Sequence, residues 1–236
     1  MTGLRSSGGI SAYLEQVFHI CRVWWYGFGM DFVHPISAVI PGVQGRVLEV
    51  LAATTAELNL RSLARLSGVS VAQASRVLPG LVDLGLVERR EVPPSSQFLF
   101  VRSHVAAGPI LALANARESV FVEFGRIAKS LPLRPVSVIV FGSLARGEAD
   151  LGSDIDVVLV RPPGVGDDDE VWGVAVERWR VAVHRLTGNA VEVLEVAASD
   201  VASRLASRSQ VWRDIRRDGR VVFGVQFDEL AGVRVG

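Results

Sequence analysis

Two aspartates stand at the start of an apolar run near the middle of the chain. Asp154 and Asp156 flank Ile155 and lead into residues 157–160 (VVLV). Because side chains alternate across a β-strand, both carboxylates point to one face while Ile155 points to the core. Carboxylates beside aliphatic residues are costly unless a positive charge offsets them. Paired oxygen ligands on a rigid strand suit magnesium, so the pair predicts a metal site.

A glycine-serine turn precedes these aspartates. Residues 136–141 (VSVIVF) have the branched, apolar content of a buried strand, and residues 144–146 (LAR) favour the start of a helix. A strand, a tight turn and a helix N-terminus leave backbone N–H groups pointing outward, and such groups attract phosphate. We therefore expect Gly142 and Ser143 to hold the phosphates of a nucleotide, with Ser143 adding a hydroxyl donor.

The stretch GSLARGEADLGSDIDVVLV, residues 142–160, resembles the DNA polymerase beta-like nucleotidyltransferase superfamily, above all its minimal bacterial members. The likeness covers about residues 136–224, including the spacing of the two motifs and the strands around them. It implies an α/β domain with a mixed sheet, two Mg²⁺ ions (or Mn²⁺), and transfer of a nucleoside monophosphate from an NTP such as ATP to an acceptor. The acceptor is not named by any motif.

The resemblance also implies roles for individual residues. Asp154 and Asp156 become catalytic metal ligands, and Glu192 occupies the position of a third carboxylate on a neighbouring strand. The family usually has aspartate there, so a longer side chain must reach the same ions. Glu195 has the opposite strand parity, although a register error of one residue would exchange the two glutamates. The nucleotide-binding positions are Gly142, Ser143, Arg146 and Ser153, where Arg146 either neutralises a phosphate or pairs with Glu148 or Asp150.

Further elements must position these residues. Residues 168–186 predict a helix whose apolar side is formed by Trp172, Val176, Trp179 and Val183. The run 190–196 (AVEVLEV) predicts the strand that carries Glu192. Val211, Trp212 and Ile215 are expected in the core of a closing helix, and residues 220–224 (RVVFG) predict a last strand.

The region 41–103 has a different pattern. After Pro41, one helical face carries Val43, Val47, Leu48 and Leu51. A second helix begins at Asn59 or Ser62 and ends at Gly68. A third begins at Ser70, and its inward-facing residues are Val71, Ala74, Val77 and Leu78. The strands 86–92 and 97–101 then form a hairpin. Pro79-Gly80 should kink or stop the third helix near Leu78.

This order of elements resembles the winged helix-turn-helix domains of bacterial transcriptional regulators. The resemblance implies a homodimer on double-stranded DNA, with the third helix in the major groove and the hairpin wing on the backbone. The implied DNA-binding residues are Gln73, Ser75, Arg76, Arg89 and Arg90. Such domains also serve as dimerisation or protein-docking platforms, and Arg89 and Arg90 could instead form ion pairs with Glu88 and Glu91 along a solvated edge.

The segments divide the chain into four parts: a leader (1–35), the winged helix-turn-helix (36–106), a connector formed by one long helix (107–134) and the nucleotidyltransferase domain (135–236). The aromatic-rich leader predicts an amphipathic helix docked on the body or on a second subunit. Alternatively, translation begins at Met30.

Composition excludes several classes of function. The 25 basic and 25 acidic residues cancel, and Lys129 is the only lysine, so a GxxxxGK[ST] phosphate loop is absent. The single cysteine, Cys21, forms no internal disulfide and suits a reducing cytoplasm. Residues 17–33 are interrupted by charge and are too polar to span a membrane. We expect a cytoplasmic protein without a membrane partner.

Two functions remain open. In the first, the chain is a magnesium-dependent nucleotidyltransferase coupled to a DNA-binding winged helix. In the second, it is a transcriptional regulator or an antitoxin, and the nucleotidyltransferase domain serves as a nucleotide sensor or as a docking surface for a protein such as a toxin. An antibiotic-modifying enzyme is a weaker third interpretation, because it gives the winged helix no purpose.

Overall fold

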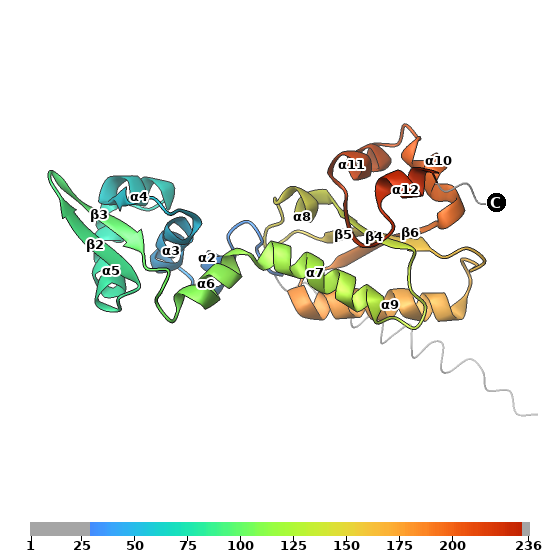
Figure 1. The fold of residues 1–236 in the computed structure, drawn as a ribbon, viewed down its shortest axis with the longest axis horizontal. Helices are drawn as coiled ribbons and strands as arrows, with labels where there is room; N and C mark the ends of the chain where they lie inside the picture. The colour runs from blue at the N-terminus through green and yellow to red at the C-terminus, as the bar shows by residue number, and fades with distance from the viewer. Residues whose placement is uncertain (1–28, 233–236) are drawn as a thin grey trace, which may run out of the picture.

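A computed structural model describes residues 29–232 of the chain. Two folded units lie at opposite ends of the molecule in Figure 1, with helices α6 (Ala107–Ala114) and α7 (Ala116–Lys129) leading from one to the other. The predicted combination of a winged helix-turn-helix and an α/β unit with a mixed sheet is confirmed. The expectations for residues 1–28 lie outside the described part of the chain.

The N-terminal unit is a helical bundle with a three-stranded wing. Its elements are α2 (Pro35–Val39), α3 (Val43–Ala53), β1 (Leu58–Asn59), α4 (Leu60–Leu66), α5 (Val71–Asp83), β2 (Val87–Val92) and β3 (Ser95–Phe100). The strand order is β1-β3-β2, antiparallel throughout. Asn59 caps α4 by accepting from the Ser62 N–H, and Ser70 forms a reciprocal capping box with Gln73 at the start of α5.

Helix α5 differs from the expectation at its proline. The helix does not stop near Leu78 but continues through Pro79 to Asp83. Pro79 is exposed, whereas Leu78 and Leu81 on either side of it are buried in the core of the unit. That burial offsets the roughly 3 kcal/mol that an internal proline costs a helix. Val71, which was expected to face inward, is exposed in the first turn.

The connector is two helices rather than one. Asn115 breaks the apolar repeat between α6 and α7, and its Nδ2 donates to the carbonyl of Leu111 at 2.9 Å. Ile110 of α6 belongs to the core of the N-terminal unit, while Phe121 and Phe124 of α7 belong to the C-terminal core. Each helix is therefore part of the unit on its own side.

The C-terminal unit is built on a four-stranded sheet in the order β6-β5-β4-β7. Its strands are β4 (Ser137–Phe141), β5 (Ile155–Arg161), β6 (Val191–Ala197) and β7 (Arg220–Gly224). Strand β5 is parallel to β6 and antiparallel to β4, and β4 is antiparallel to β7. Helix α8 (Gly142–Arg146) follows β4 directly.

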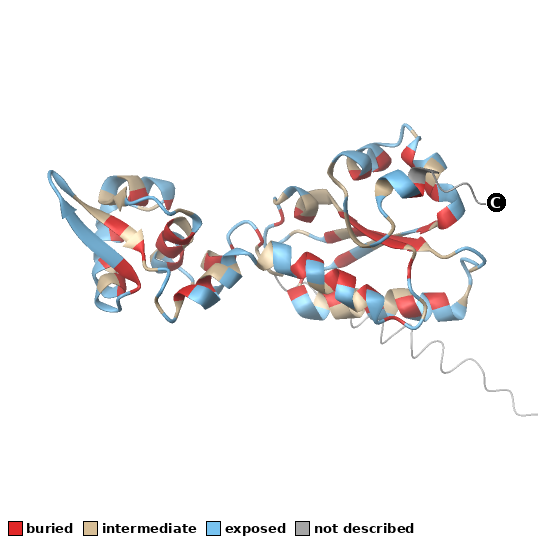
Figure 2. Cartoon of the chain, viewed as in Figure 1, coloured by how far each residue is buried: buried red, intermediate tan, exposed pale blue. Residues whose placement is uncertain are grey.

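Helices cover both faces of this sheet (Figure 1). One face carries α7 and α9 (Glu170–Thr187), where the rings of Phe124 and Trp179 meet edge to face at 5.6 Å. The other carries the 3-10 helix η1 (Ala198–Asp200), α10 (Val201–Leu205), α11 (Gln210–Asp218) and α12 (Phe227–Gly232). Figure 2 shows the buried residues concentrated in the strands and on the inner sides of the helices. Trp212 and Ile215 are buried as expected, but Val211 is exposed.

The first described residues lie against the C-terminal unit. The N–H groups of Gly29, Met30 and Phe32 donate to the carbonyls of Leu151, Thr187 and Ala149 at 3.0, 2.9 and 2.9 Å. Phe32 is buried in the same core as α7 and α9. The chain thus contacts this unit before it enters the winged helix. None of the described helices combines the length and the apolar character needed to cross a bilayer.

Candidate active site and DNA-facing surface

The three predicted carboxylates meet at one edge of the sheet. Asp154 immediately precedes β5, and Asp156 is the second residue of that strand. Glu192 of β6 is the direct neighbour of Asp156 in the parallel register. Ile155 is 1% exposed and belongs to the opposite, α7/α9 face, so alternation turns Asp156 and Glu192 to the other side of the sheet.

Repulsion and burial raise the pKa of the Asp156 carboxyl above its ordinary 3.8. The largest cause is burial, followed by the negative charges of Asp154 and Glu192, and the charge of Arg146 opposes them. Among the described residues, none of the three carboxylates accepts a hydrogen bond or forms an ion pair. Like charges have therefore been brought together, and the arginines whose charges act on them, Arg146 on Asp156 and Arg180 on Glu192, form no ion pair with them among the described residues.

Gly142 allows this arrangement. It follows β4 with φ of 69°, a left-handed conformation that favours glycine, and a Cβ at this position would collide with Asp156 Oδ2. Phe141, the residue before it, pairs with Asp156 across the β4–β5 ladder. The backbone at the start of α8 consequently lies directly against the carboxylate. Ser143 is the next residue of that helix.

Two other predicted nucleotide-binding residues have partners within the protein. Arg146 Nε donates to Glu148 at 2.7 Å, and Arg146 also faces Asp218 at 3.8 Å, whereas Asp150 is not its partner. The hydroxyl of Ser153 donates to Asp150 Oδ1 at 2.8 Å. Ser153 therefore shapes the loop that leads into the aspartates.

Asn189 contributes to the site and was missed by the sequence interpretation. Its side chain is almost fully buried; Oδ1 accepts from the Met30 N–H at 3.0 Å, and Nδ2 donates to the Ser153 carbonyl at 2.9 Å. The Ser153 carbonyl belongs to the peptide that joins Ser153 to Asp154. Asn189 thus holds the loop before the aspartates against the start of β6. The only signal in the sequence was the turn Thr187-Gly188-Asn189, which indicated a helix end.

Arg117 was also missed. From α7 its Nε donates to the carbonyl of Leu144 at 2.9 Å, and Nη2 donates to that of Ala145 at 2.7 Å. These carbonyls lie in α8, which has only five residues; Arg117 supplies the donor to Ala145 and adds a second donor to Leu144, whose carbonyl also accepts from the Gly147 N–H at 3.2 Å. Helix α7 thereby supports the turn at Gly142.

Glu195 lies on the other side of β6. It is the neighbour of Leu159 in the register, and Leu159 belongs to the α7/α9 core. The indole Nε1 of Trp172 in α9 donates to its carboxylate. The parity that separated Glu195 from Glu192 is confirmed.

On the N-terminal unit, the predicted reading residues are exposed along α5. The side chain of Gln73 is engaged in the capping box, and the Ser75 hydroxyl donates to the Ala72 carbonyl at 3.0 Å. Arg76 is exposed and forms no ion pair within residues 29–232. The side chains of Gln73 and Ser75 therefore form hydrogen bonds within α5, whereas that of Arg76 forms none among the described residues.

The wing arginines are paired with acidic neighbours. Arg89 Nη2 lies 2.7 Å from Glu91, and Arg90 contacts both Glu88 at 2.7 Å and Glu57. The hydrogen bond from Arg90 is the main reason why the pKa of Glu88 is lowered. The structure therefore has Arg89 and Arg90 in ion pairs along an exposed edge, which was the alternative to DNA contacts in the sequence analysis.

Two family models match the chain. Residues 123–201 match the nucleotidyltransferase domain, and residues 45–91 match the IclR helix-turn-helix domain. The chain therefore carries a nucleotidyltransferase domain behind an N-terminal helix-turn-helix. The first match contains Asp154, Asp156 and Glu192, and the second runs from α3 into β2 and ends before β3.

Similar solved structures include a homodimeric winged helix-turn-helix DNA-binding domain from Mycobacterium bovis, with 21% identity, 52% of this chain and 94% of that chain covered, and a TM-score of 0.29. A MarR-family transcriptional regulator from Rhodococcus sp. RHA1 has 19% identity, coverage of 53% and 86%, and a TM-score of 0.28. A toxin-antitoxin structure with AMP-PNP has 19% identity, coverage of 49% and 81%, and a TM-score of 0.32. No curated protein matches.

Proposed function

We propose that this chain is a magnesium-dependent nucleotidyltransferase that moves a nucleoside monophosphate from an NTP to an acceptor hydroxyl. One observation carries the proposal: within a nucleotidyltransferase domain, Asp156 lies between Asp154 and Glu192 and against the backbone of Gly142, without a cationic contact from the described residues. Such an arrangement costs stability unless a ligand offsets the charge.

The residues present fit a magnesium ion. Within residues 29–232 no group of three or more His, Cys, Asp or Glu side chains is arranged to hold a metal ion by itself, so any ion would need ligands from the substrate and water. Magnesium is usually held by one or two carboxylates together with water and substrate phosphates, rather than by a cage made of protein alone. Asp154 and Asp156 supply that pair, and Glu192 completes the site for a second ion; Mn²⁺ suits the same oxygen ligands. When bound, divalent ions lower the pKa of the acceptor hydroxyl and offset charge on the leaving group.

The protein's own groups then orient the substrate. We assign the N–H groups at the Gly142–Ser143 turn and the Ser143 hydroxyl to the terminal phosphates of the NTP. Arg146, already beside the carboxylates, adds positive charge there. Ser153 acts on the loop that carries Asp154. The acceptor oxygen bonds to the α-phosphorus, the bond from that phosphorus to the bridging oxygen breaks, and pyrophosphate leaves.

Labelled NTPs, Mg²⁺ and candidate acceptors test this reaction with the full chain. Asp154→Asn should abolish transfer while leaving the thermal melting curve cooperative. The matched control is Glu195→Gln, which lies on β6 but on the opposite face of the sheet and should keep its activity. Full turnover by Asp154→Asn would refute the metal role.

We further propose that the winged helix binds double-stranded DNA as a homodimer, with Gln73, Ser75 and Arg76 of α5 facing the groove and Arg89 and Arg90 facing the backbone. The IclR helix-turn-helix match over residues 45–91 supports this assignment. NTPs and DNA are both found in the cytoplasm, where we place the protein.

A second candidate function follows from the third carboxylate. Glu192 is exposed and stands where the resemblance leads us to expect aspartate, which favours a domain that binds a nucleotide without transferring it. The protein would then be a regulator or an antitoxin that docks a protein partner such as a toxin. Tight DNA binding together with NTP binding, but no labelled product with any acceptor, would select this function.

A further inference from the structure

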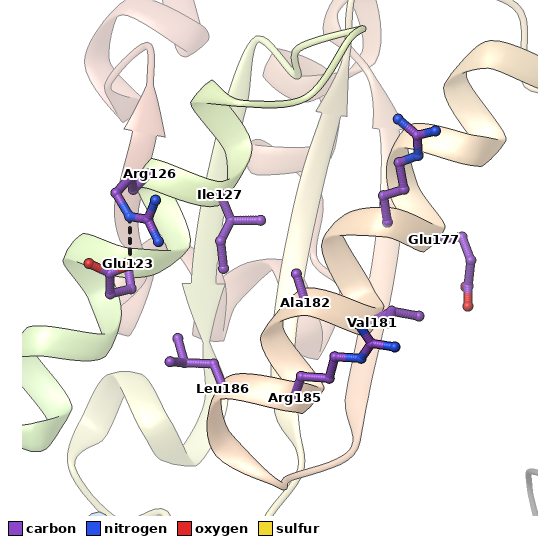
Figure 3. A pocket seen from close by; sticks show the side chains of 9 residues that line it. Glu123, Arg126, Ile127, Glu177, Val181, Ala182, Arg185 and Leu186 are labelled. Carbon is purple, nitrogen blue, oxygen red and sulfur yellow. Dashed lines mark hydrogen bonds and ion pairs between the residues drawn. The ribbon is translucent and has the colours of Figure 1, made fainter.

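Two neighbouring hollows lie on the α7/α9 side of the C-terminal unit. The first has a volume of about 620 Å³ and lies between α7 and α9 (Figure 3). The second has about 560 Å³ and lies beside Gly29 and Met30, where α6, α7 and the end of α9 come together. Both are lined by Glu123 and Leu186, so they lie next to each other. We name the two hollows together the α7/α9 groove.

The lining of the groove combines apolar and charged side chains. In the first hollow, drawn in Figure 3, Ile127, Val181, Ala182 and Leu186 are apolar, and the other lining residues are arginines and glutamates. Leu186, which lines both hollows, is 48% exposed. A leucine left in water where two hollows meet indicates a surface that another apolar segment covers.

The chain itself provides such a segment at the mouth of the groove. Residues 29 and 30 line the second hollow, and the Gly29 N–H is held by the Leu151 carbonyl at 3.0 Å. The preceding residues 17–28 (VFHICRVWWYGF) include Trp24, Trp25, Tyr26 and Phe28, with Arg22 the only arginine. Aromatic side chains bury more apolar area than other residues and drive such contacts.

Chain length favours occupation by the same molecule. Trp24 precedes Gly29 by five residues, so even a fully extended chain places it within about 17 Å of Gly29. A segment tethered at that distance has an effective concentration of the order of millimolar, which a free partner or a second copy rarely reaches. We propose that residues 17–28 bind the α7/α9 groove of their own chain. This inference does not depend on the proposed catalysis.

Cys21 makes the proposal testable, because it is the only cysteine of the chain and lies inside the segment. The experiment measures how fast a thiol reagent modifies Cys21 in the full-length protein. Leu186→Glu places a charge in the part of the lining that both hollows share. It should raise the modification rate about tenfold, since the reagent reaches the thiol only in the undocked fraction. Val105→Glu, at a residue 88% exposed and outside the groove, should leave the rate unchanged.

Tryptophan quenching gives a second readout. Trp172, Trp179 and Trp212 are 1%, 0% and 5% exposed, so Trp24 and Trp25 dominate any change in quenching by acrylamide. Leu186→Glu should increase quenching relative to the wild type and to Val105→Glu. Equal Cys21 rates and equal quenching in all three proteins overturn the proposal.

The molar mass in solution separates the same chain from a second copy. If the segment of one copy fills the groove of another, Leu186→Glu will lower the mass measured by light scattering as it exposes Cys21. That result overturns binding within one chain. An unchanged mass together with faster modification supports it. A melting temperature close to that of the wild type shows that the variant is folded.

Discussion

Charged side chains are arranged in opposite ways in the wing and at the start of β5 and β6 in the C-terminal sheet. In the wing, Arg89 and Arg90 each lie against a carboxylate, and these contacts are exposed. At the sheet edge, Asp154, Asp156 and Glu192 face one another, and their mutual repulsion contributes to the raised pKa of Asp156. Paired surface charges add little to stability and are easily rearranged. Repelling carboxylates lower stability, so their presence indicates a function that uses them.

Neutralising Asp156 should have the largest effect. Asp156→Asn removes the carboxylate beside Gly142, which we propose as a metal ligand, and we expect transfer to fall at least about 100-fold. It also removes the repulsion, so in metal-free buffer at neutral pH the variant should melt at a higher temperature than the wild type. Mg²⁺ should raise the melting temperature of the wild type and have little effect on the variant.

The raised pKa of Asp156 also predicts how the stability difference between Asp156→Asn and the wild type changes with pH. Because the folded pKa of Asp156 is raised, the folded protein binds this proton more tightly than the unfolded chain does. The stability that the proton adds is fully present below the ordinary pKa of 3.8 and is lost as the pH rises through the raised value. The advantage of Asp156→Asn in metal-free buffer should therefore shrink as the pH falls toward 3.8. An advantage that grows on acidification would contradict the assignment.

Gly142→Ala should have the next largest effect. Gly142 and Gly164 have φ of 69° and 79°, so alanine costs each of them about 1–2 kcal/mol in the left-handed region. Only at Gly142 does the new Cβ meet a neighbour, the Asp156 carboxylate; at Gly164 it meets nothing within 4 Å. Gly142→Ala should lose about 1–3 kcal/mol more than Gly164→Ala in denaturant titrations, together with most of its activity. Equal losses of stability and activity in the two variants would show that the contact with Asp156 is unimportant.

The sequence predicted the parts of this site that depend on local periodicity. Alternation predicted the shared face of Asp154 and Asp156 and the opposite parity of Glu192 and Glu195 on β6, and the helix signals Gly68 and Ser70 located α4 and α5. These features arise from neighbours within a few residues, which is why they can be read without a structure.

The features that were missed or wrong depend on distant contacts. Asn189 is 159 residues from Met30 and 36 from Ser153, and no local pattern indicates such partners. A single polar residue, Asn115, was not sufficient to predict a helix end, and the division becomes visible only because α6 and α7 bury their apolar faces in different cores. The prediction that the helix ends at Pro79 was wrong because the sequence does not show that Leu81 is buried, and this burial offsets the cost of the proline.

Asn189→Ala should have an intermediate effect on the carboxylate edge. Loss of the side chain leaves the Ser153 carbonyl without the Asn189 donor and the Met30 N–H with the Thr187 carbonyl alone, which costs about 1–3 kcal/mol. Ser137→Ala is the matched control: it also removes a buried side chain with two hydrogen bonds, but at the opposite end of β4 from the Asp156 pair. We expect Asn189→Ala to weaken Mn²⁺ binding about tenfold in titrations well below the melting temperature, and Ser137→Ala to leave it unchanged. A similar metal affinity in both variants would reduce Asn189 to a purely structural role.

The smallest expected effect is on DNA affinity, where replacing Arg76 and replacing Arg90 on the N-terminal unit should give different results. Arg76 has no ion pair among the described residues, so it can neutralise a DNA phosphate without losing an internal contact, whereas Arg90 must first exchange Glu57 and Glu88 for the phosphate. With a mixed-sequence duplex, Arg76→Ala should lower affinity by about 1 kcal/mol and reduce the slope of log K against log salt by about 1. Arg90→Ala should lower affinity by no more than about twofold, because the loss of the Glu57 and Glu88 contacts on binding offsets most of what its phosphate contact contributes. If Arg90→Ala instead reduces both affinity and slope as much as Arg76→Ala, the ion pairs of Arg90 with Glu57 and Glu88 break when DNA binds. The wing would then resemble the carboxylates of β5 and β6, in that its charged groups serve to bind a ligand.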